Sequence, residues 1–215
     1  MSGPASRPSR WLLLAAISGL VFTADQATKY LAVAGLTRAF ETAGTAGAKS
    51  PGEKLAAFVT EKDLLERGLV RGHVDVFESW FQLRYTQNRG AAWGFLSGAR
   101  AWFRVPFFHL VTLGAIAFIL AYYRKLEEGQ RYLQTALALL LGGALGNGLD
   151  RALHGYVIDF IDWHLRDPHW TLPMRHWPTF NVADCGVSVG LVLLLLEMFF
   201  VRRSSGTTST PSSTP

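Results

Sequence analysis

The stretch Gly186-Val-Ser-Val-Gly-Leu-Val-Leu-Leu-Leu-Leu196 is apolar apart from one serine. Such a pattern is typical of a membrane-crossing helix, because the bilayer core is about 30 Å thick and takes about 20 mainly apolar residues. Asp184 lies two residues before this stretch, within Phe180-Asn-Val-Ala-Asp184. A charged side chain inside a bilayer costs about 3 kcal/mol, so a carboxylate at this edge is a candidate for function.

The composition of the whole chain also indicates a membrane protein. Of its 215 residues, 49% are hydrophobic and 17% are charged, and the mean hydropathy is +0.18. A soluble domain usually has about 25% charged residues. We predict an all-α membrane protein with one domain, 1–203, and a tail, 204–215, whose Ser, Thr and Pro content predicts disorder. Four stretches have the length of a transmembrane helix: 11–36, 103–123, 132–149 and 183–201.

The first of these stretches is the least regular. Asp25, Gln26 and Lys29 interrupt it, and residues 11–24 have the length and the basic flank of a cleaved secretory signal. The apolar continuation over 30–36 favours a retained helix instead. We therefore expect 11–36 to remain as a membrane helix.

Four spans would place both ends of the chain on one side of the membrane. Basic residues near that side, among them Arg10, the 124–131 link and Arg202, favour the cytoplasm, where Lys and Arg are enriched in short loops. Two outer segments, about 38–102 and 151–179, would then lie on the opposite side.

The longer outer segment contains two regular patterns. Ser50-Pro-Gly-Glu53 has the spacing of a capping box and predicts the start of a short helix. Leu55, Phe58 and Leu65 give this region a rough apolar face. Residues 77–85 alternate apolar and polar side chains around aromatic ones, which predicts a strand.

Several classes of function are disfavoured by the residues present. The net charge is +5, but the basic residues are dispersed without a nucleic-acid motif, so we expect no nucleic-acid partner and assign them to topology and lipid headgroups. Cys185 is the single cysteine, which excludes an internal disulfide, and we expect it to be a small buried membrane residue. The chain lacks H-E-x-x-H and a paired helical spacing of histidines, so we expect no metal site and no cofactor.

Polar residues gather at the ends of two predicted spans. On a helix, Asn147 faces the same side as Asp150 and Arg151, so the three can form one hydrogen-bonded cluster. An Asp150–Arg151 pair that only closes the helix end explains Asp150 better than catalysis does. Asn181 has the spacing of an N-cap for Asp184, and a good helix start would by itself account for Asp184.

A further acid lies in the strand-like apolar run Tyr156-Val-Ile-Asp-Phe-Ile161. Asp162 competes with Asp159 for any functional role, and the local pattern leaves this choice open. Two carboxylates close together cannot both ionise easily, so such a pair holds one proton. One acid can then take a proton from water while the other polarises a carbonyl, which is the chemistry of aspartic proteases.

Two other classes of function fit the same residues. A small proton-coupled membrane transporter would use Asp25, Asp150, Asp159 and Asp184 as a relay, although it would need carboxylates at several depths of the bilayer. A noncatalytic assembly factor would use the polar groups to lock helices together.

Five motifs occur in an order that resembles a known family. They are Asp25-Gln-Ala-Thr-Lys29, Asn88-Arg-Gly-Ala-Ala-Trp-Gly94, Gly146-Asn-Gly-Leu-Asp-Arg151, Val157-Ile-Asp-Phe160 and Phe180-Asn-Val-Ala-Asp184. Together they are similar to the conserved motifs of lipoprotein signal peptidase, or signal peptidase II. The likeness covers about 11–201, except for a stretch around 38–72 that is longer than usual.

This resemblance implies a bacterial inner-membrane peptidase with its site on the periplasmic side and both termini cytoplasmic. It would remove the signal peptide of diacylglyceryl-modified prolipoproteins before the lipidated cysteine. It would contact membrane lipid, have a small periplasmic β-cradle and a short periplasmic helix, and be inhibited by globomycin. Asp159 and Asp184 would be the catalytic pair.

The resemblance also implies supporting roles for further positions. Those expected to bind substrate or support the site are Asn88, Gly90, Asn147, Arg151, Asn181 and Ala183. Those expected to be structural polar residues are Asp25, Lys29 and Asp150.

Overall fold

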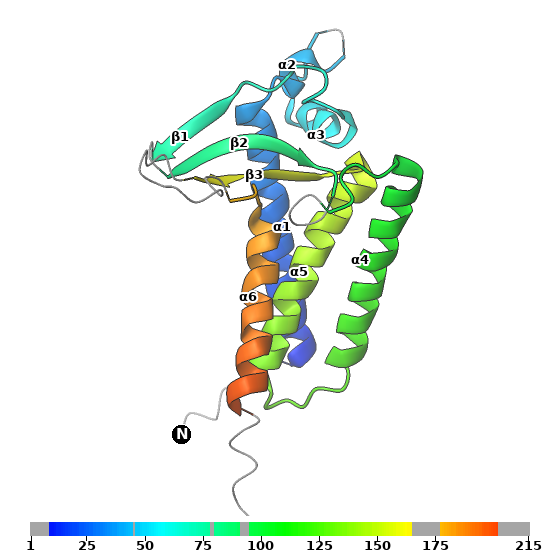
Figure 1. Ribbon diagram of the computed structural model, residues 1–215, viewed down its shortest axis with the longest axis vertical. Helices are drawn as coiled ribbons and strands as arrows, with labels where there is room; N and C mark the ends of the chain where they lie inside the picture. The colour runs from blue at the N-terminus through cyan, green and yellow to red at the C-terminus, as the bar shows by residue number, and fades with distance from the viewer. Residues whose placement is uncertain (1–8, 45, 78–79, 91–94, 165–176, 202–215) are drawn as a thin grey trace, which may run out of the picture.

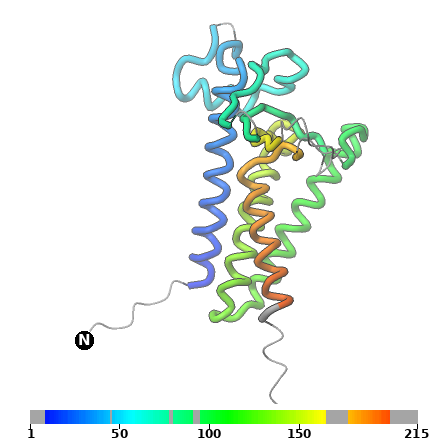
Figure 2. The backbone as a smooth tube through the Cα atoms, turned by 60° about the vertical axis from the view of Figure 1, so that its left-hand side comes forward, coloured from blue at the N-terminus to red at the C-terminus, as the bar shows by residue number. Residues whose placement is uncertain are grey.

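The protein is a bundle of long helices with a small antiparallel sheet across one end (Figures 1 and 2). The computed structural model describes residues 9–44, 46–77, 80–90, 95–164 and 177–201. The predicted disordered tail, 204–215, and the middle of the second outer segment, 165–176, lie outside these ranges. The long helices are α1 (Arg10–Leu36), α4 (Ala101–Tyr123), α5 (Arg131–His154) and α6 (Val182–Leu196), which continues as a π-helix, η2 (Glu197–Val201).

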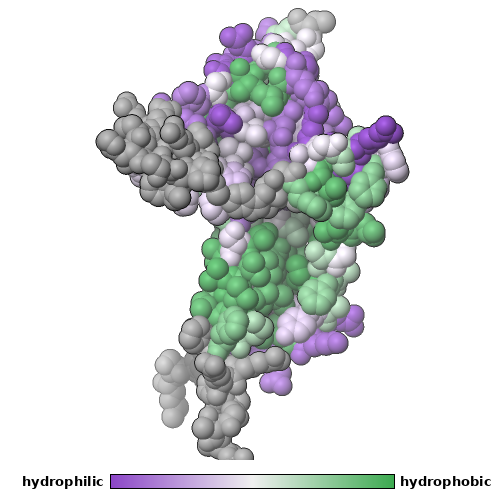
Figure 3. Space-filling model, viewed as in Figure 1, coloured by the Kyte–Doolittle hydropathy of each residue, from purple (hydrophilic) through white to green (hydrophobic). Residues whose placement is uncertain are grey.

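Among the described residues, three helices are long and apolar enough to cross a membrane: α1, α4 and the stretch Val182–Phe199. Their outward side chains are apolar, as Leu20, Leu110 and Leu191 show with exposed fractions of 71%, 72% and 51%. Figure 3 shows hydrophobic side chains over the helices, with hydrophilic side chains gathered above and below them. This arrangement is typical of a protein whose helices face lipid.

The fourth long helix, α5, packs between α1, α4 and α6. Its glycines allow the close approach. A Cβ at Gly143 would meet the carbonyl oxygen of Ala183 at 2.6 Å, and a Cβ at Gly142 would meet Ser18 O at 2.8 Å. Small residues at helix contacts are typical of membrane proteins, because dispersion and hydrogen bonds have to supply the association there.

The structure corrects one predicted helix end. The sequence pattern ended the third span at 149, whereas α5 continues to His154 and stops at Gly155, which has a φ of 78°. Glycine adopts this left-handed conformation readily at a helix end. Asp150 stays inside the helix because its side chain finds partners in the protein, which are described below.

The sheet has the order β1-β2-β3, formed by His73–Phe77, Phe81–Asn88 and Val157–Trp163, and both pairings are antiparallel. The strand predicted over 77–85 is wrong in its bounds, because β1 ends at Phe77 and β2 begins at Phe81 within that stretch. The strand predicted around Asp159 is confirmed. In the β2–β3 register, Thr86 lies opposite Asp159 and Asn88 lies opposite Val157.

The longer outer segment folds over the sheet end of α1. It contains α2 (Ala39–Thr42) and α3 (Pro51–Thr60), and the predicted capping box of Ser50 and Glu53 is present. Phe58 and Leu64 are buried in a core with Tyr156, which directly precedes β3. The predicted apolar face is only partly correct, because Leu55 and Leu65 are exposed.

Candidate active site

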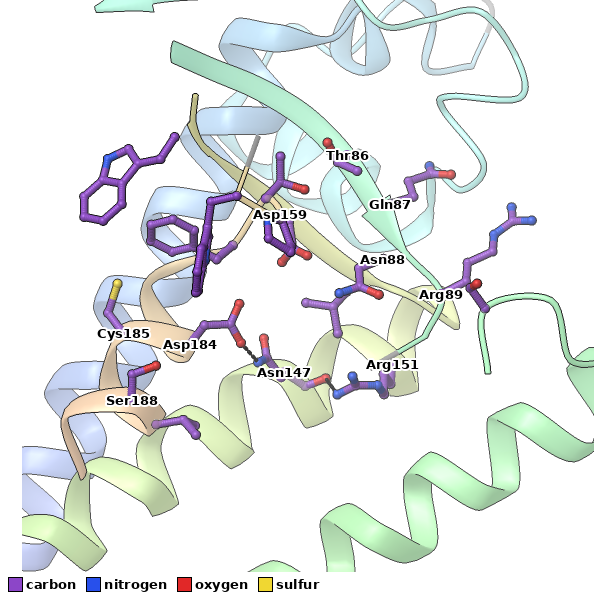
Figure 4. Close-up of a pocket in the computed structure, with 18 of the residues that line it drawn as sticks. Thr86, Gln87, Asn88, Arg89, Asn147, Arg151, Asp159, Asp184, Cys185 and Ser188 are labelled. Atoms are coloured by element: carbon purple, nitrogen blue, oxygen red, sulfur yellow. Dashed lines mark hydrogen bonds between the residues drawn. The ribbon is translucent and has the colours of Figure 1, made fainter. Parts of the chain in front are cut away.

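A cavity of about 970 Å³ opens where β2 and β3 meet the sheet ends of α5 and α6 (Figure 4). Its polar lining includes Asp159, Asp184, Asn88, Asn147 and Arg151. Apolar side chains continue the lining along α6 and after β3: Val187, Val189, Trp177, Pro178 and Phe180. The cavity therefore offers polar groups beside an apolar wall, which is the usual lining of a ligand site.

The position of Asp184 follows from how α6 begins. Asn181 is the N-cap, and its Oδ1 accepts from Asp184 N at 3.0 Å while Asp184 Oδ2 accepts from Asn181 N at 3.1 Å. These reciprocal bonds form a capping box, which satisfies backbone N–H groups that the first helical turn leaves free. The predicted N-cap is confirmed, and it fixes the carboxylate at the cavity.

Asp159 reaches the cavity from the middle of β3 and is only 1% exposed. Its Oδ1 accepts from Asn181 Nδ2 at 2.7 Å, while its Oδ2 has no hydrogen-bond partner among the described residues. Burial, and second the negative charge of Asp184, raise the pKa of Asp159 to about 8, although Asn88 and Asn181 favour the ionised form. The surroundings of Asp159 therefore favour its protonated form.

Two amide side chains connect the acids. Asn147 donates from Nδ2 to Asp184 Oδ1 at 2.8 Å, the bond drawn in Figure 4. Asn181 Nδ2 lies within hydrogen-bond distance of both Asp159 Oδ1 and Asn147 Oδ1, at 2.7 and 3.1 Å. The side chains of Asp159, Asn181, Asn147 and Asp184 thus form one network, although they come from β3, α5 and α6.

A buried ion cluster lies directly beneath this network. Lys29 Nζ is 2.8 Å from Asp25 Oδ2, 2.8 Å from Asp150 Oδ2 and 3.1 Å from Asn147 Oδ1. All three charged side chains are buried, and buried charges are tolerated only when they are paired and hydrogen-bonded. Asp150 therefore pairs with Lys29, 121 positions earlier, and the predicted Asp150–Arg151 pair is wrong.

The same cluster holds the strand and helix that carry the two acids. Asp25 Oδ1 accepts from Ala183 N at 2.9 Å, next to Asp184. Asp150 Oδ2 accepts from Ile158 N at 2.9 Å, next to Asp159. Each acid of the cluster is thus hydrogen-bonded to the backbone beside one acid of the cavity.

Arg151 lies at the other edge of the cavity. Its Nη2 donates to Gly90 O at 3.3 Å and its Nη1 to the backbone oxygen of Asn147 at 3.4 Å, while its guanidinium lies 4.9 Å from the centre of the Phe108 ring. Asn88 Oδ1 accepts from Gly90 N at 3.0 Å. All the positions that the motifs singled out as catalytic or supporting are therefore brought together.

Two other predictions turn out differently. Asp162 is buried, but it accepts a hydrogen bond from Gln82 Nε2 and does not line the cavity. Cys185 is exposed and lines the cavity, so the expectation of a buried cysteine is wrong. In a strand, side chains three positions apart point to opposite faces, which is why Asp159 and Asp162 separate.

Sequence reasoning overlooked two residues of this site. Gln26 donates to Asp150 Oδ1 at 3.1 Å, and Arg89 lines the cavity beside Asn88. Both lie inside motifs that the resemblance rests on, between residues that were singled out. The location of Gln26 and Arg89 inside those motifs could have indicated that they belong to the site.

The comparisons with known proteins agree with this geometry. A family model described as "Signal peptidase (SPase) II" matches residues 17–200. A lipoprotein signal peptidase of Anaeromyxobacter sp. (strain Fw109-5) is 49% identical over 194 residues, covering 90% of this chain and 88% of that protein. One of Syntrophotalea carbinolica is 38% identical over 151 residues, covering 67% of this chain and 88% of that protein.

Two solved structures, both titled as bacterial membrane enzyme structures, have the same fold. One has a TM-score of 0.61 at 24% identity and covers 93% of this chain and 94% of that chain. The other has a TM-score of 0.57 at 26% identity, with 87% and 92% covered. The comparisons give no support to the transporter alternative. With a family match over most of its length and close relatives of that name, this chain belongs to the signal peptidase II family, the peptidases that remove signal peptides from prolipoproteins.

Proposed function

We propose that the protein is an aspartic endopeptidase in which Asp159 and Asp184 are the catalytic pair. Its substrate is a diacylglyceryl-modified prolipoprotein, cut before the lipidated cysteine. The observation that carries this proposal is the shared network: both carboxylates line one cavity and are joined through Asn181 and Asn147.

The environments of the two acids support different roles. Because the pKa of Asp159 is raised to about 8, its proton is available to polarise the scissile carbonyl at pH 7. Asp184 accepts hydrogen bonds from Asn147 Nδ2 and Asn181 N, which hold its two oxygens at the cavity. Asp184 therefore acts as the general base.

The reaction needs no covalent intermediate. Asp184 takes a proton from a water molecule while the water oxygen attacks the scissile carbonyl carbon, and Asp159 gives its proton to the carbonyl oxygen. The tetrahedral intermediate then collapses: Asp184 protonates the leaving nitrogen, the C–N bond breaks, and Asp159 recovers its proton.

The remaining lining supports a lipidated, membrane-bound substrate. A helical signal peptide has to unwind before its peptide bond can be attacked, and Asn88 and Arg151 supply polar groups for the freed backbone. Val187 and Val189 continue the cavity along α6, where the acyl chains of the diacylglyceryl group would lie. Occupation of the same cavity by globomycin would inhibit the enzyme.

We place the protein in the bacterial inner membrane with four spans, α1, α4, α5 and α6. Supporting this, α1 begins and α6 ends at the same end of the bundle, opposite the sheet (Figure 1). Arg10 and the link between α4 and α5, with Arg124, lie at that end, which the positive-inside rule assigns to the cytoplasm. The sheet, α3 and the cavity would then be periplasmic.

The test is cleavage of a purified, diacylglyceryl-modified prolipoprotein by wild-type, Asp159→Asn and Asp184→Asn protein. Both variants should lose about 10²- to 10⁴-fold in rate, the usual contribution of a general acid or base. Asp162→Asn is the matched control, because Asp162 is equally buried on the same strand, and it should keep its activity. Wild-type cleavage by a folded variant of either proposed acid would refute the pair, and inhibition by a chelator would point to metal chemistry.

A further inference from the structure

Arg89, at the edge of the cavity, is held by two carboxylates of the outer segment. Its Nη2 lies 2.7 Å from Asp63 Oδ1, and its Nη1 lies 2.6 Å from Glu66 Oε1. Each carboxylate thus engages a different nitrogen of the planar guanidinium. Because two of its nitrogens are held separately, the plane of the guanidinium has a fixed orientation. A lysine ammonium in a single ion pair would stay free to rotate.

The loop that supplies these carboxylates is itself anchored. Leu64, between them, is 2% exposed and belongs to the core with Phe58 and Tyr156. Asp63 O and Leu64 O accept from Arg67 N and Leu69 N, both at 2.9 Å. The backbone that carries the two carboxylates is therefore held in place by the core and by its own hydrogen bonds.

Arg89 comes directly after the last residue of β2. The β2–β3 ladder ends at the Asn88–Val157 pair, so strand pairing does not hold the chain beyond Asn88. Both neighbours of Arg89 matter to the site: the Asn88 side chain favours the ionised form of Asp159, and Gly90 O accepts from Arg151 Nη2. In Figure 4, Arg89 lies beyond Asn88 as seen from Asp159.

We propose that Asp63 and Glu66 act as a clamp on Arg89, and that Arg89 is thereby a positioning residue for the cavity rim formed by Asn88 and Gly90. The outer segment 38–72 would thus control the peptidase through one side chain, without contacting the substrate. This inference rests on the proposed function, because it concerns the rate at which the Asp159–Asp184 pair works.

The expected effect is on turnover. Asn88 lies at the acids and the scissile segment, whereas the apolar wall, which would hold most of the lipidated substrate, is formed by α6 and by residues after β3. A displacement of about 1 Å near reacting groups costs up to about 100-fold in rate. Loss of the clamp should therefore lower kcat about tenfold or more and leave KM within about threefold of the wild-type value.

The test compares Arg89→Gln with the double variant Asp63→Asn/Glu66→Gln. Asp63 has a φ of 54°, and asparagine, like aspartate, adopts this conformation more readily than most residues with a side chain, so the double variant removes charge and keeps the turn. Both variants should show the same fall in kcat. The triple variant should be no slower than Arg89→Gln, because all three act through one contact. Arg89→Lys, which keeps the charge without the fork, should recover only part of the rate.

Glu61→Gln is the matched control, since it breaks the exposed Glu61–Arg67 ion pair of the same loop and should leave kcat unchanged. If the folded double variant had the wild-type kcat while Asp159→Asn was inactive, the clamp would be overturned and the catalytic pair would stand. A triple variant whose loss of kcat equalled the product of the losses in Arg89→Gln and the double variant would overturn the clamp as well. An active Asp159→Asn would overturn the catalytic pair on which the clamp depends.

Discussion

The ammonium group of Lys29 donates to Asn147 Oδ1 at 3.1 Å, and Asn147 donates in turn to Asp184 Oδ1 at 2.8 Å. This contact joins the ion cluster of α1 to the acids of the cavity. Because Lys29 also pairs with Asp25 and Asp150, one buried cation orients residues beside both acids. The cluster is therefore part of how the site is held, as well as of how the helices pack.

Replacing Lys29 by methionine should destabilise the protein strongly. The change leaves Asp25 and Asp150 as buried carboxylates without their cation, and breaking such a pair typically costs about 3–5 kcal/mol. Thermal unfolding in detergent measures the loss. Lys49→Met is the control, because Lys49 is exposed. An unfolding temperature equal to the wild-type value would contradict the role of the cluster.

Substitutions of Asn181 should separate its structural role from its role at the acids. Asn181→Ala removes the N-cap of α6 and should cost about 1 kcal/mol as well as activity. Asn181→Ser keeps a capping oxygen but lacks the amide that donates to Asp159 Oδ1. The serine variant should therefore regain stability in thermal unfolding while remaining slow in the cleavage assay. Wild-type activity in the serine variant would show that the amide bond to Asp159 is dispensable.

The rate should fall at alkaline pH. The pKa of Asp159 is about 8, above its ordinary value of 3.8, because burial and then the charge of Asp184 disfavour ionisation. The pair loses its single proton as pH rises through 8, so kcat/KM should fall about tenfold per pH unit above that point. Asn88→Ala should move this limb to higher pH, since Asn88 favours the ionised form. A limb below pH 7 would contradict the assignment.

Stability should depend on pH for the same reason. Between pH 3.8 and about 8, Asp159 is protonated in the folded protein and ionised in the unfolded chain. The folded state therefore binds more protons, and its stability falls as pH rises across this window. Asp159→Asn should lack this contribution and gain unfolding temperature relative to wild type from pH 4 to 8. If the unfolding temperatures of Asp159→Asn and wild type differed by the same amount at pH 4 and at pH 8, the pKa of Asp159 would not be raised.

Gly146→Ala should damage the protein where α5 meets α1. A Cβ at Gly146 would collide with the Asp25 carboxylate and lie 3.2 Å from the Ala183 Cβ. Overpacking of this kind typically costs about 1–3 kcal/mol. Gly114→Ala on α4 is the matched control, because a Cβ there has no neighbour within 4 Å. Equal thermal unfolding of the two variants would refute the close packing around Asp25.

Local features of this protein could be predicted because neighbouring residues determine them. The helices over 10–36, 101–123 and 182–196 follow from mainly apolar stretches of sufficient length. The capping boxes of Ser50 and Asn181 use partners three positions away, so both were visible in the sequence. The motifs were also sufficient to indicate the family.

Contacts between distant residues could not be predicted in this way. Nothing near Asp150 indicated that its partner would be Lys29 on α1, because adjacent Arg151 offers the same charge. The local pattern around β3 left Asp159 and Asp162 equally acceptable. The β2–β3 register decided between them by turning Asp159 toward the cavity and Asp162 toward Gln82.

The sequence by itself therefore determined which segments form long helices, which of them are apolar enough to cross a membrane and where α6 begins, since these depend on hydrophobicity and on bonds within one turn. The tertiary structure decided which charges pair, and it brought into one cavity the two acids that only the family resemblance had singled out. The physical reason is that a buried polar group is stabilised by whatever partner lies within about 3 Å of it, and the contacts between Lys29 and Asp150 and between Asp159 and Asn181 join parts of the chain that lie far apart in the sequence.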